Sequence, residues 1–337
     1  MRAIAAGLLT LMVGTSVLAD DVVNIYSSRH YDTDEAFYQN FTKQTGITVN
    51  RIDGKADELI ERILAEGEAS PADILITVDA GRLWRATEAE IFAPVESEIL
   101  TTAIPATMRD ADNLWFGFSK RVRMIIVNPD LVDPAAVQNY EDLTSEAAAD
   151  QVCIRSSSNI YQLSLMATLI EHLGEAEAQS WAEGVVGNFA REPEGNDTAQ
   201  IRAVASGECG VALANSYYLA RLGNSDDADD RAVFDKVAYV FPNQDNRGAH
   251  VNFSGAGMVK GAPNAENAIK FLEYMASPEA QAHFANGNNE YPVVDGVEID
   301  NPSLDAMGAY EEDKIDLGVY GRNQALAQLL YDAAGWR

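Results

Sequence analysis

The sequence predicts an α/β protein built around a mostly parallel sheet with helices on both faces. Strand-like and helix-like segments alternate through the first hundred residues, and a repeated βα order requires parallel strands that are covered on both sides. The chain has 337 residues, of which 47% are hydrophobic, so it is long enough for two lobes with separate cores. Ligands of such sheets bind beyond the carboxyl ends of the strands, so residues that follow strands are the candidates for a site.

The alternation begins with a near-continuous apolar strand over 22–28. Asp32 and Glu35 resemble a capping box, which predicts a helix that carries Phe37 and Phe41 and stops at Gly46. A strand over 47–52, an amphipathic helix over 56–66 and a buried strand over 73–78 complete this part. The segment 27–31 therefore follows the first strand and lies at the ligand-binding edge of the sheet.

The middle of the chain repeats this style with new elements. A strand over 121–127 has a polar start, as expected of a segment that crosses between lobes. It is followed by a strand over 151–154, a helix over 159–172, a strand over 210–214 and a helix that begins at Tyr217. In the tail we expect strands over 236–241 and 250–253, a tight turn over 254–257 and a helix over 264–275, and the acidic stretch 224–231 is expected to be a solvated loop.

The N-terminus predicts export. Residues 1–19 carry one positive charge at Arg2, then an apolar run, and end with small residues at Val17 and Ala19. This pattern is typical of a cleavable signal peptide, and the rest of the chain has no apolar run long enough for a membrane anchor. We therefore expect a periplasmic protein that does not insert into the membrane.

The charge of the chain argues against some partners. The formal net charge is −28, and such a field repels nucleic acid and anionic lipid while it concentrates cations. It does not identify a ligand, because acidity also serves solubility. Binding to nucleic acid is therefore not expected.

The two cysteines predict a disulfide. Cys153 ends one expected strand and Cys209 precedes another, and an even number of cysteines in an oxidising compartment favours a bond between them. Two buried thiols are the alternative.

The positions of the tyrosines give the strongest functional signal. Tyr31 directly follows His30, Tyr161 lies in the first turn of a helix after a strand, and Tyr217 and Tyr218 begin another such helix. With 13 tyrosines in 337 residues, chance alone gives roughly half of one adjacent pair, so the pair by itself is weak evidence. Five such residues at three strand ends predict one cleft, and a purely structural role for them is the alternative.

Four phenol oxygens and an imidazole favour iron. Zinc prefers Cys, His and carboxylate, whereas calcium and magnesium prefer carboxylate and carbonyl oxygens. Fe(III) prefers hard anionic oxygens and can deprotonate phenols, whose free pKa is near 10. Four phenolates would leave an excess negative charge of about one on the Fe(III) site, and Arg121, Arg155 and Arg29 are the candidate cations. Fe(II) is the alternative oxidation state, and no organic cofactor is expected.

Three segments resemble the periplasmic iron-binding proteins that supply ABC importers. They are NIYSSRHY at 24–31, CIRSSSNIY at 153–161, and GECG at 207–210 leading to NSYY at 215–218. The resemblance covers essentially the whole mature chain and matches in order and spacing. It implies metal ligands His30 and Tyr31 from the first lobe and Tyr161, Tyr217 and Tyr218 from the second. It also implies that Arg121 lies beside the metal.

The resemblance further implies the two-lobed periplasmic binding protein fold of type II, with two crossover strands and a ligand cleft between lobes that close like a hinge. The expected N-terminal lobe comprises 20–120 and about 248–290, and the expected C-terminal lobe comprises 121–247 and about 291–337. The implied protein is a monomer that captures ferric iron and passes it to an ABC permease in the inner membrane. Some relatives bind an additional anion at the metal.

Two other functions remain open at this stage. Arg155 and the serines at 156–158 stand at a helix start and would suit phosphate or sulfate in a binding protein of the same fold. An exported enzyme with Tyr217 or His30 as acid or base is the other alternative. No nucleophile elbow or HExxH zinc motif supports it, so we expect that the chain is not an enzyme.

Overall fold

A computed structural model describes residues 21–29 and 31–337 of the chain. The expected signal peptide and the candidate ligand His30 lie outside the described residues. Within the part that is described, no helix is both long enough and apolar enough to cross a membrane.

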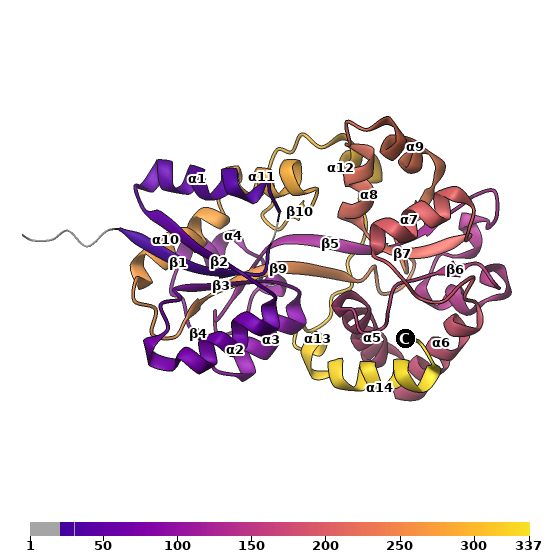
Figure 1. Ribbon diagram of the computed structural model, residues 1–337, viewed down its shortest axis with the longest axis horizontal. Helices are drawn as coiled ribbons and strands as arrows, with labels where there is room; N and C mark the ends of the chain where they lie inside the picture. Colours follow the sequence, from indigo (N-terminus) through magenta and orange to yellow (C-terminus); the bar gives the residue numbers. More distant parts are fainter. Residues whose placement is uncertain (1–20, 30) are drawn as a thin grey trace, which may run out of the picture.

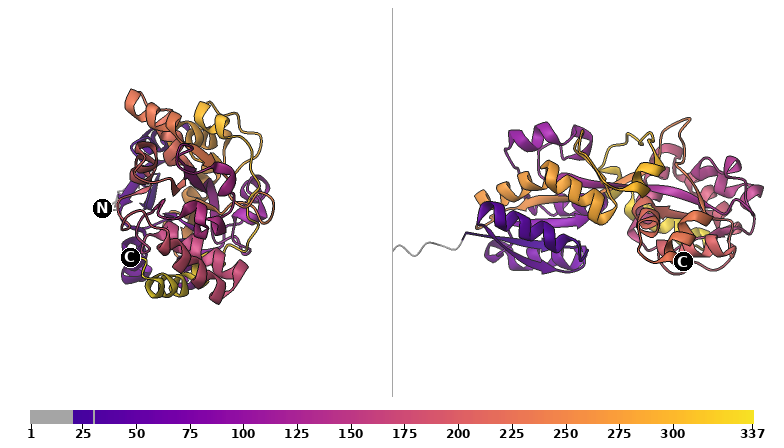
Figure 2. Two further views of the ribbon diagram at one scale, coloured as in Figure 1. Left: turned by 90° about the vertical axis from the view of Figure 1, so that its right-hand side faces the viewer. Right: turned by 90° about the horizontal axis from the view of Figure 1, so that it is seen from above.

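The molecule has two lobes that are joined by a pair of long strands (Figure 1). The joining strands are β5 (Phe116–Val127) and β9 (Val251–Val259), which are antiparallel neighbours. Viewed from above, the elements at the start of the chain gather on one side of this waist and those of the middle on the other (Figure 2). We call these the N-terminal lobe, with β1–β4, α1–α4, α10 and α11, and the C-terminal lobe, with β6–β8, α5–α9, α12 and α14.

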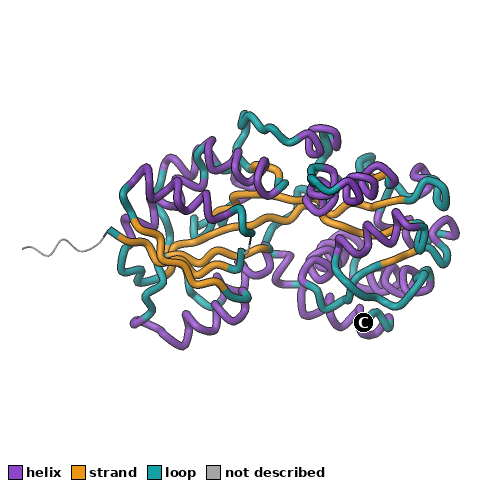
Figure 3. Tube along the Cα trace, turned by 45° about the horizontal axis from the view of Figure 1, so that its top comes forward, coloured by secondary structure: helices purple, strands orange, loops and turns teal. Residues whose placement is uncertain are grey.

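One sheet path runs through both lobes in the order β2-β1-β3-β9-β5-β7-β6 (Figure 3). The strands β1, β2 and β3 are parallel, as are β6 and β7, whereas β9 is antiparallel to both β3 and β5. The remaining strand bounds are β1 (Val22–Ser27), β2 (Thr48–Asp53), β3 (Ile74–Val78), β4 (Phe92–Ala93), β6 (Val152–Cys153), β7 (Val211–Asn215), β8 (Ala238–Val240) and β10 (Tyr291–Pro292).

The helices cover the sheet in both lobes (Figure 3). In the N-terminal lobe they are α1 (Asp34–Thr45), α2 (Ala56–Glu66), α3 (Ala80–Glu88), α4 (Glu98–Ala103), α10 (Ala265–Met275) and α11 (Pro278–Asn288). The other α-helices are α5 (Ile160–Leu173), α6 (Glu175–Gly187), α7 (Asp197–Ser206), α8 (Ser216–Gly223), α9 (Ala228–Lys236), α12 (Pro302–Met307), α13 (Val319–Arg322) and α14 (Gln324–Ala334). The predicted βα alternation of the first hundred residues is confirmed.

The expected turn over 254–257 is wrong, because β9 continues through it to Val259. Its glycines serve close packing instead of a turn. A Cβ at Gly257 would lie 2.4 Å from the carbonyl oxygen of Leu114 and 2.5 Å from the ring of Phe92. A side chain at Gly257 would therefore clash with Leu114 and Phe92.

The acidic stretch 224–231 is also not entirely a loop. Helix α9 begins at Ala228, and the Asp227 side chain accepts a hydrogen bond from the backbone N–H of Asp229. The carboxylates of this stretch lie at a helix N-terminus, where negative charge is favourable.

The two lobes do not have fully separate cores. The larger core cluster extends from Phe37 and Phe271 in the N-terminal lobe to Cys153 and Leu219 in the C-terminal lobe. A second cluster around Trp181 and the C-terminal helix α14 lies only in the C-terminal lobe. The crossover strands carry apolar side chains that connect the lobes, which the division of the sequence into two halves did not reveal.

Candidate metal centre

Four of the five predicted metal ligands line one cavity. Tyr31, Tyr161, Tyr217 and Tyr218 surround a space of about 450 Å³. Tyr31 follows β1, Tyr161 lies in the first turn of α5, and the pair lies in the first turn of α8. Each ligand position thus follows a strand, as the sequence predicts. His30 precedes Tyr31 in sequence and lies outside the described residues.

The tyrosine side chains that line the cavity lie close to one another. The hydroxyl oxygens of Tyr161 and Tyr217 are 3.2 Å apart. The rings of Tyr217 and Tyr218 are 4.1 Å apart between centroids, and the ring of Tyr31 stands edge-on to that of Tyr217 at 6.4 Å. Tyrosines from both lobes therefore meet at one point.

Conventional metal ligands do not gather elsewhere. Among the residues described, no group of three or more His, Cys, Asp or Glu side chains could hold a metal ion.

Burial disfavours the ionised form of three of these phenols. It raises the pKa of Tyr31 and Tyr217 well above the ordinary value, and neighbouring Glu290 adds to the shift at Tyr31. Burial, with Tyr161 and Asp197 nearby, raises the pKa of Tyr218 to about 12. A ligand that converts them to phenolates must supply strong positive charge, and Fe(III) does so.

The loop that carries Tyr31 is held by a buried ion network around Arg29. The guanidinium of Arg29 pairs with Asp34 at 2.9 Å and with Glu290 at 3.0 Å, and it lies 4.9 Å from the ring centroid of Tyr31. Although burial opposes ionisation, Arg29 holds the pKa of Asp34 well below its usual range. This pairing places Asp34 at the first residue of α1. The predicted Asp32–Glu35 capping box is wrong, because α1 begins at Asp34 with Thr33 before it.

The three candidate arginines differ in how far their charge is already neutralised. Arg29 has the two carboxylate partners just described, and Arg155 pairs with Asp197 at 2.8 Å. Arg121 is buried on β5, and its one hydrogen bond is to the hydroxyl of Ser254 at 3.2 Å. Within the described chain its Nε and Nη2 atoms have no hydrogen-bond partner. The guanidinium lies 5.7 Å from the ring centroid of Tyr161, and the carboxylates of Glu290 and Asp79 also attract its charge.

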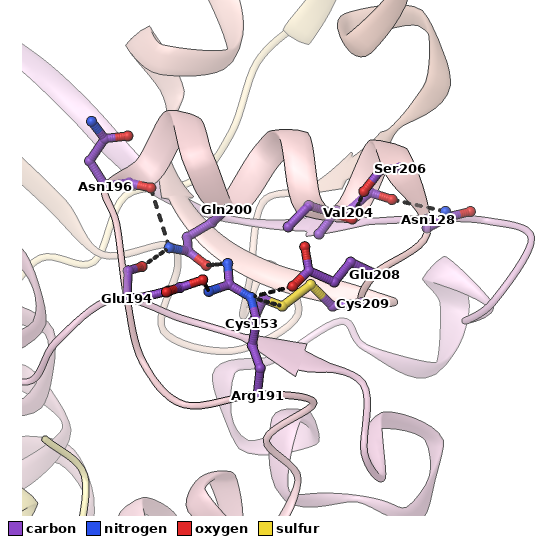
Figure 4. The surroundings of a disulfide bond; sticks show 11 residues. Asn128, Cys153, Arg191, Glu194, Asn196, Gln200, Val204, Ser206, Glu208 and Cys209 are labelled. Carbon is purple, nitrogen blue, oxygen red and sulfur yellow. Dashed lines mark hydrogen bonds and ion pairs between the residues drawn. A yellow bond between two sulfur atoms is a disulfide. The ribbon is translucent and has the colours of Figure 1, made fainter.

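A disulfide supports the strand that leads to the tyrosine pair (Figure 4). Cys153 at the end of β6 is bonded to Cys209, two residues before β7, which confirms the predicted pairing. The Nε atom of Arg191 lies 3.3 Å from the sulfur of Cys153 and 3.0 Å from a carboxylate oxygen of Glu208. Strand β7 then leads directly into Tyr217.

The sequence did not predict several residues that line the cavity. They are Asp32, Thr33, Val78, Asn196, Arg221, Gly287, Asn288 and Asn289. Arg221 lies over the ring of Tyr218 at 5.1 Å, one turn later in α8. Asn288 and Asn289 come from the end of α11, far from the tyrosines in sequence, and the polar run at 286–290 is their one local signal.

The family model for bacterial extracellular solute-binding proteins matches residues 36–311. The chain belongs to this family. Its fold is the two-lobed α/β fold of type II periplasmic binding proteins, which its solved relatives share.

Individual relatives match over nearly the whole chain. "Iron uptake protein A1" of Synechocystis is 51% identical over 94% of this chain and 87% of its own length. The "Fe(3+)-binding periplasmic protein" of Serratia marcescens is 26% identical over 93% of this chain and 90% of its own length. A Trichodesmium protein solved with iron and citrate is 57% identical with a TM-score of 0.89, and the match covers 94% of this chain and all of that chain. A ferric binding protein of Campylobacter jejuni is 40% identical with a TM-score of 0.88, over 94% of this chain and all of that chain.

Proposed function

We propose that this protein captures ferric iron in the periplasm and delivers it to the permease of an ABC importer. The observation that carries the proposal is the meeting of Tyr31 with Tyr161, Tyr217 and Tyr218 in one cavity. The iron-binding and iron-uptake names of its relatives support it. His30, beside Tyr31, completes the proposed ligand set, and Arg121 offsets the excess negative charge.

The two tyrosine groups suggest how iron is retained and released. Tyr31 comes from the N-terminal lobe, and the other three tyrosines come from the C-terminal lobe. An open form offers only part of the ligand set, so the metal binds the closed form more tightly and shifts the population towards it. A permease that recognises the closed monomer then receives loaded protein selectively. An N-terminal signal at 1–19 directs the chain to the periplasm.

The alternatives have less support. For a phosphate or sulfate site, Arg155 is already paired with Asp197, and the hydroxyls of Ser156 and Ser158 are hydrogen-bonded to each other at 3.0 Å. Neither alternative explains the tyrosine cluster. The relatives carry uptake or binding names and not enzyme names.

Replacement of the tyrosine pair tests the proposal. We expect the wild type with Fe(III) to show a visible phenolate-to-iron absorption band, and we expect Y217F/Y218F to lose this band and most of the affinity. The control is Y239F/Y310F, because neither of these tyrosines lines the cavity. Equilibrium dialysis against Fe(III), Fe(II), zinc and phosphate identifies the ligand. Coloured iron binding that is unchanged in Y217F/Y218F would contradict the ligand assignment.

A further inference from the structure

The end of helix α11 contacts the start of α1, which follows Tyr31, and the end of α8, which carries Tyr217 and Tyr218. Asn288 and Asn289 are consecutive residues, and both line the metal cavity. The side-chain amide of Asn288 donates a hydrogen bond to Asp34 at 2.7 Å and accepts one from the hydroxyl of Thr33. Asn288 therefore fixes the start of α1, just after Tyr31.

Asn289 contacts the C-terminal lobe. Its Oδ1 atom accepts hydrogen bonds from the amides of Asn224 at 2.7 Å and Asn301 at 2.8 Å. Asn224 follows the last residue of α8, whose first turn carries Tyr217 and Tyr218. The contact between Asn224 and Asn289 thus links α8 of the C-terminal lobe to α11 of the N-terminal lobe.

The side-chain amides of Asn224, Asn289 and Asn301 form one hydrogen-bonded cluster. The Asn224 amide also donates to Asn301 at 2.7 Å and accepts from the hydroxyl of Ser303 at 2.6 Å, and the Asn301 amide donates to the carbonyl of Ala285 at 2.7 Å. Asn289 and Asn301 are buried. A lobe movement that separated α8 from α11 would leave buried amide groups unpaired, which costs free energy.

The backbone conformation at Asn289 allows its side chain to bond to the C-terminal lobe. Asn289 has φ of +60° and ends α11 in the left-handed conformation, which asparagine tolerates better than most residues. Helix α11 stops at this point, and consecutive side chains bond to opposite lobes.

We propose that Asn288 and Asn289 form a joint that sets the position of Tyr217 and Tyr218 relative to Tyr31. These asparagines are positioning residues that act through Asp34 and Asn224. This inference rests on the proposed iron site.

The test compares N289G with N289D. Glycine keeps the left-handed backbone but removes the acceptor, whereas aspartate keeps an acceptor oxygen for Asn224 and Asn301. Iron is supplied as the Fe(III)–nitrilotriacetate complex, and affinity and dissociation rate are measured by chelator competition. We expect N289G to bind Fe(III) about tenfold more weakly through faster dissociation, with an absorption band at the wild-type position. We expect N289D to release Fe(III) more slowly than N289G, because it keeps the acceptor oxygen for Asn224 and Asn301.

Two further variants make the result decisive. N224A removes the partner at an exposed position, so it should fold even where N289G does not, and it should weaken iron binding to a similar degree. N188A is the matched control, because the Asn188 amide also donates two hydrogen bonds, to the carbonyls of Leu143 and Ser145 within the C-terminal lobe. Equal iron affinity in N224A and N188A would overturn the joint. Failure of the wild type to bind Fe(III) would instead overturn the proposed function.

Discussion

At the scale of single residues, the proposed tyrosine ligands resist ionisation, whereas Fe(III) would require it. Burial raises the pKa of Tyr31 and Tyr217 well above the ordinary range and that of Tyr218 to about 12. At neutral pH without metal, these phenols are therefore protonated. Iron can bind them as phenolates only by releasing their protons, so metal binding is coupled to pH.

We expect each tyrosine ligand to release one proton, or about four in total, when Fe(III) binds at neutral pH. Apparent affinity should then fall as the pH falls, because protons compete with the metal for the same oxygens. Calorimetry in two buffers of different ionisation enthalpy counts the protons released.

The variant Y218F should release about one proton fewer than the wild type. Y239F should release the same number as the wild type, because Tyr239 does not line the cavity. Iron binding with no proton release would show that the metal is held by other groups.

At the scale of elements, the tyrosine pair depends on a short strand pair. Strands β6 and β7 share only two residue pairs, Val152 with Val211 and Cys153 with Ala212. The disulfide closes a sequence separation of 56 residues directly beside this pairing. It therefore supports β7 on its β6 side, whereas β5 pairs with the other side of β7 from Val211 to Asn215.

We expect C153S/C209S to lower the free energy of unfolding by about 4 kcal/mol, because the unfolded chain regains the freedom of a long loop. Guanidinium unfolding followed by circular dichroism measures the change. The iron absorption band should persist in the folded variant, since neither cysteine lines the cavity. The wild type under reducing conditions is the control and should match the variant. An unchanged unfolding midpoint in both would show that the bond does not stabilise the fold.

The sequence predicted the elements that present the tyrosines, because each combines an apolar strand with a polar strand end. It missed features that depend on distant packing. Gly255 and Gly257 resemble a turn, but close neighbours explain their small size: Leu83 and Phe116 approach Gly255, and Leu114 and Phe92 approach Gly257. The role of Asn289 arises only because α11 ends beside α8, and no local pattern encodes that neighbourhood. The lobe boundaries near 120, 248 and 290 stay a prediction.

At the scale of the whole molecule, a buried contact between the lobes supports closure. The hydroxyl of Ser164 on α5 donates a hydrogen bond to Asp79 at 2.8 Å, and both residues are fully buried. Asp79 also accepts from the amide of Asn252 on β9 at 2.6 Å. Its φ of +139° is unusual for a non-glycine residue and stores strain that the surroundings must offset. Because Ser164 lies one turn after Tyr161, this contact ties a C-terminal-lobe ligand to the junction of β3 and α3.

We therefore expect S164A to weaken closure around iron. The substitution removes one donor from a buried carboxylate, which should lower the free energy of unfolding by about 1–3 kcal/mol. Part of this loss should appear as Fe(III) affinity that is several-fold lower, because the contact joins the lobes. Small-angle scattering should show a smaller compaction on iron addition than in the wild type. The control S206A removes a hydroxyl that bonds only to the Ala203 carbonyl within α7, and it should close normally. If S164A compacted and bound iron as S206A does, the Ser164–Asp79 contact would have no part in closure.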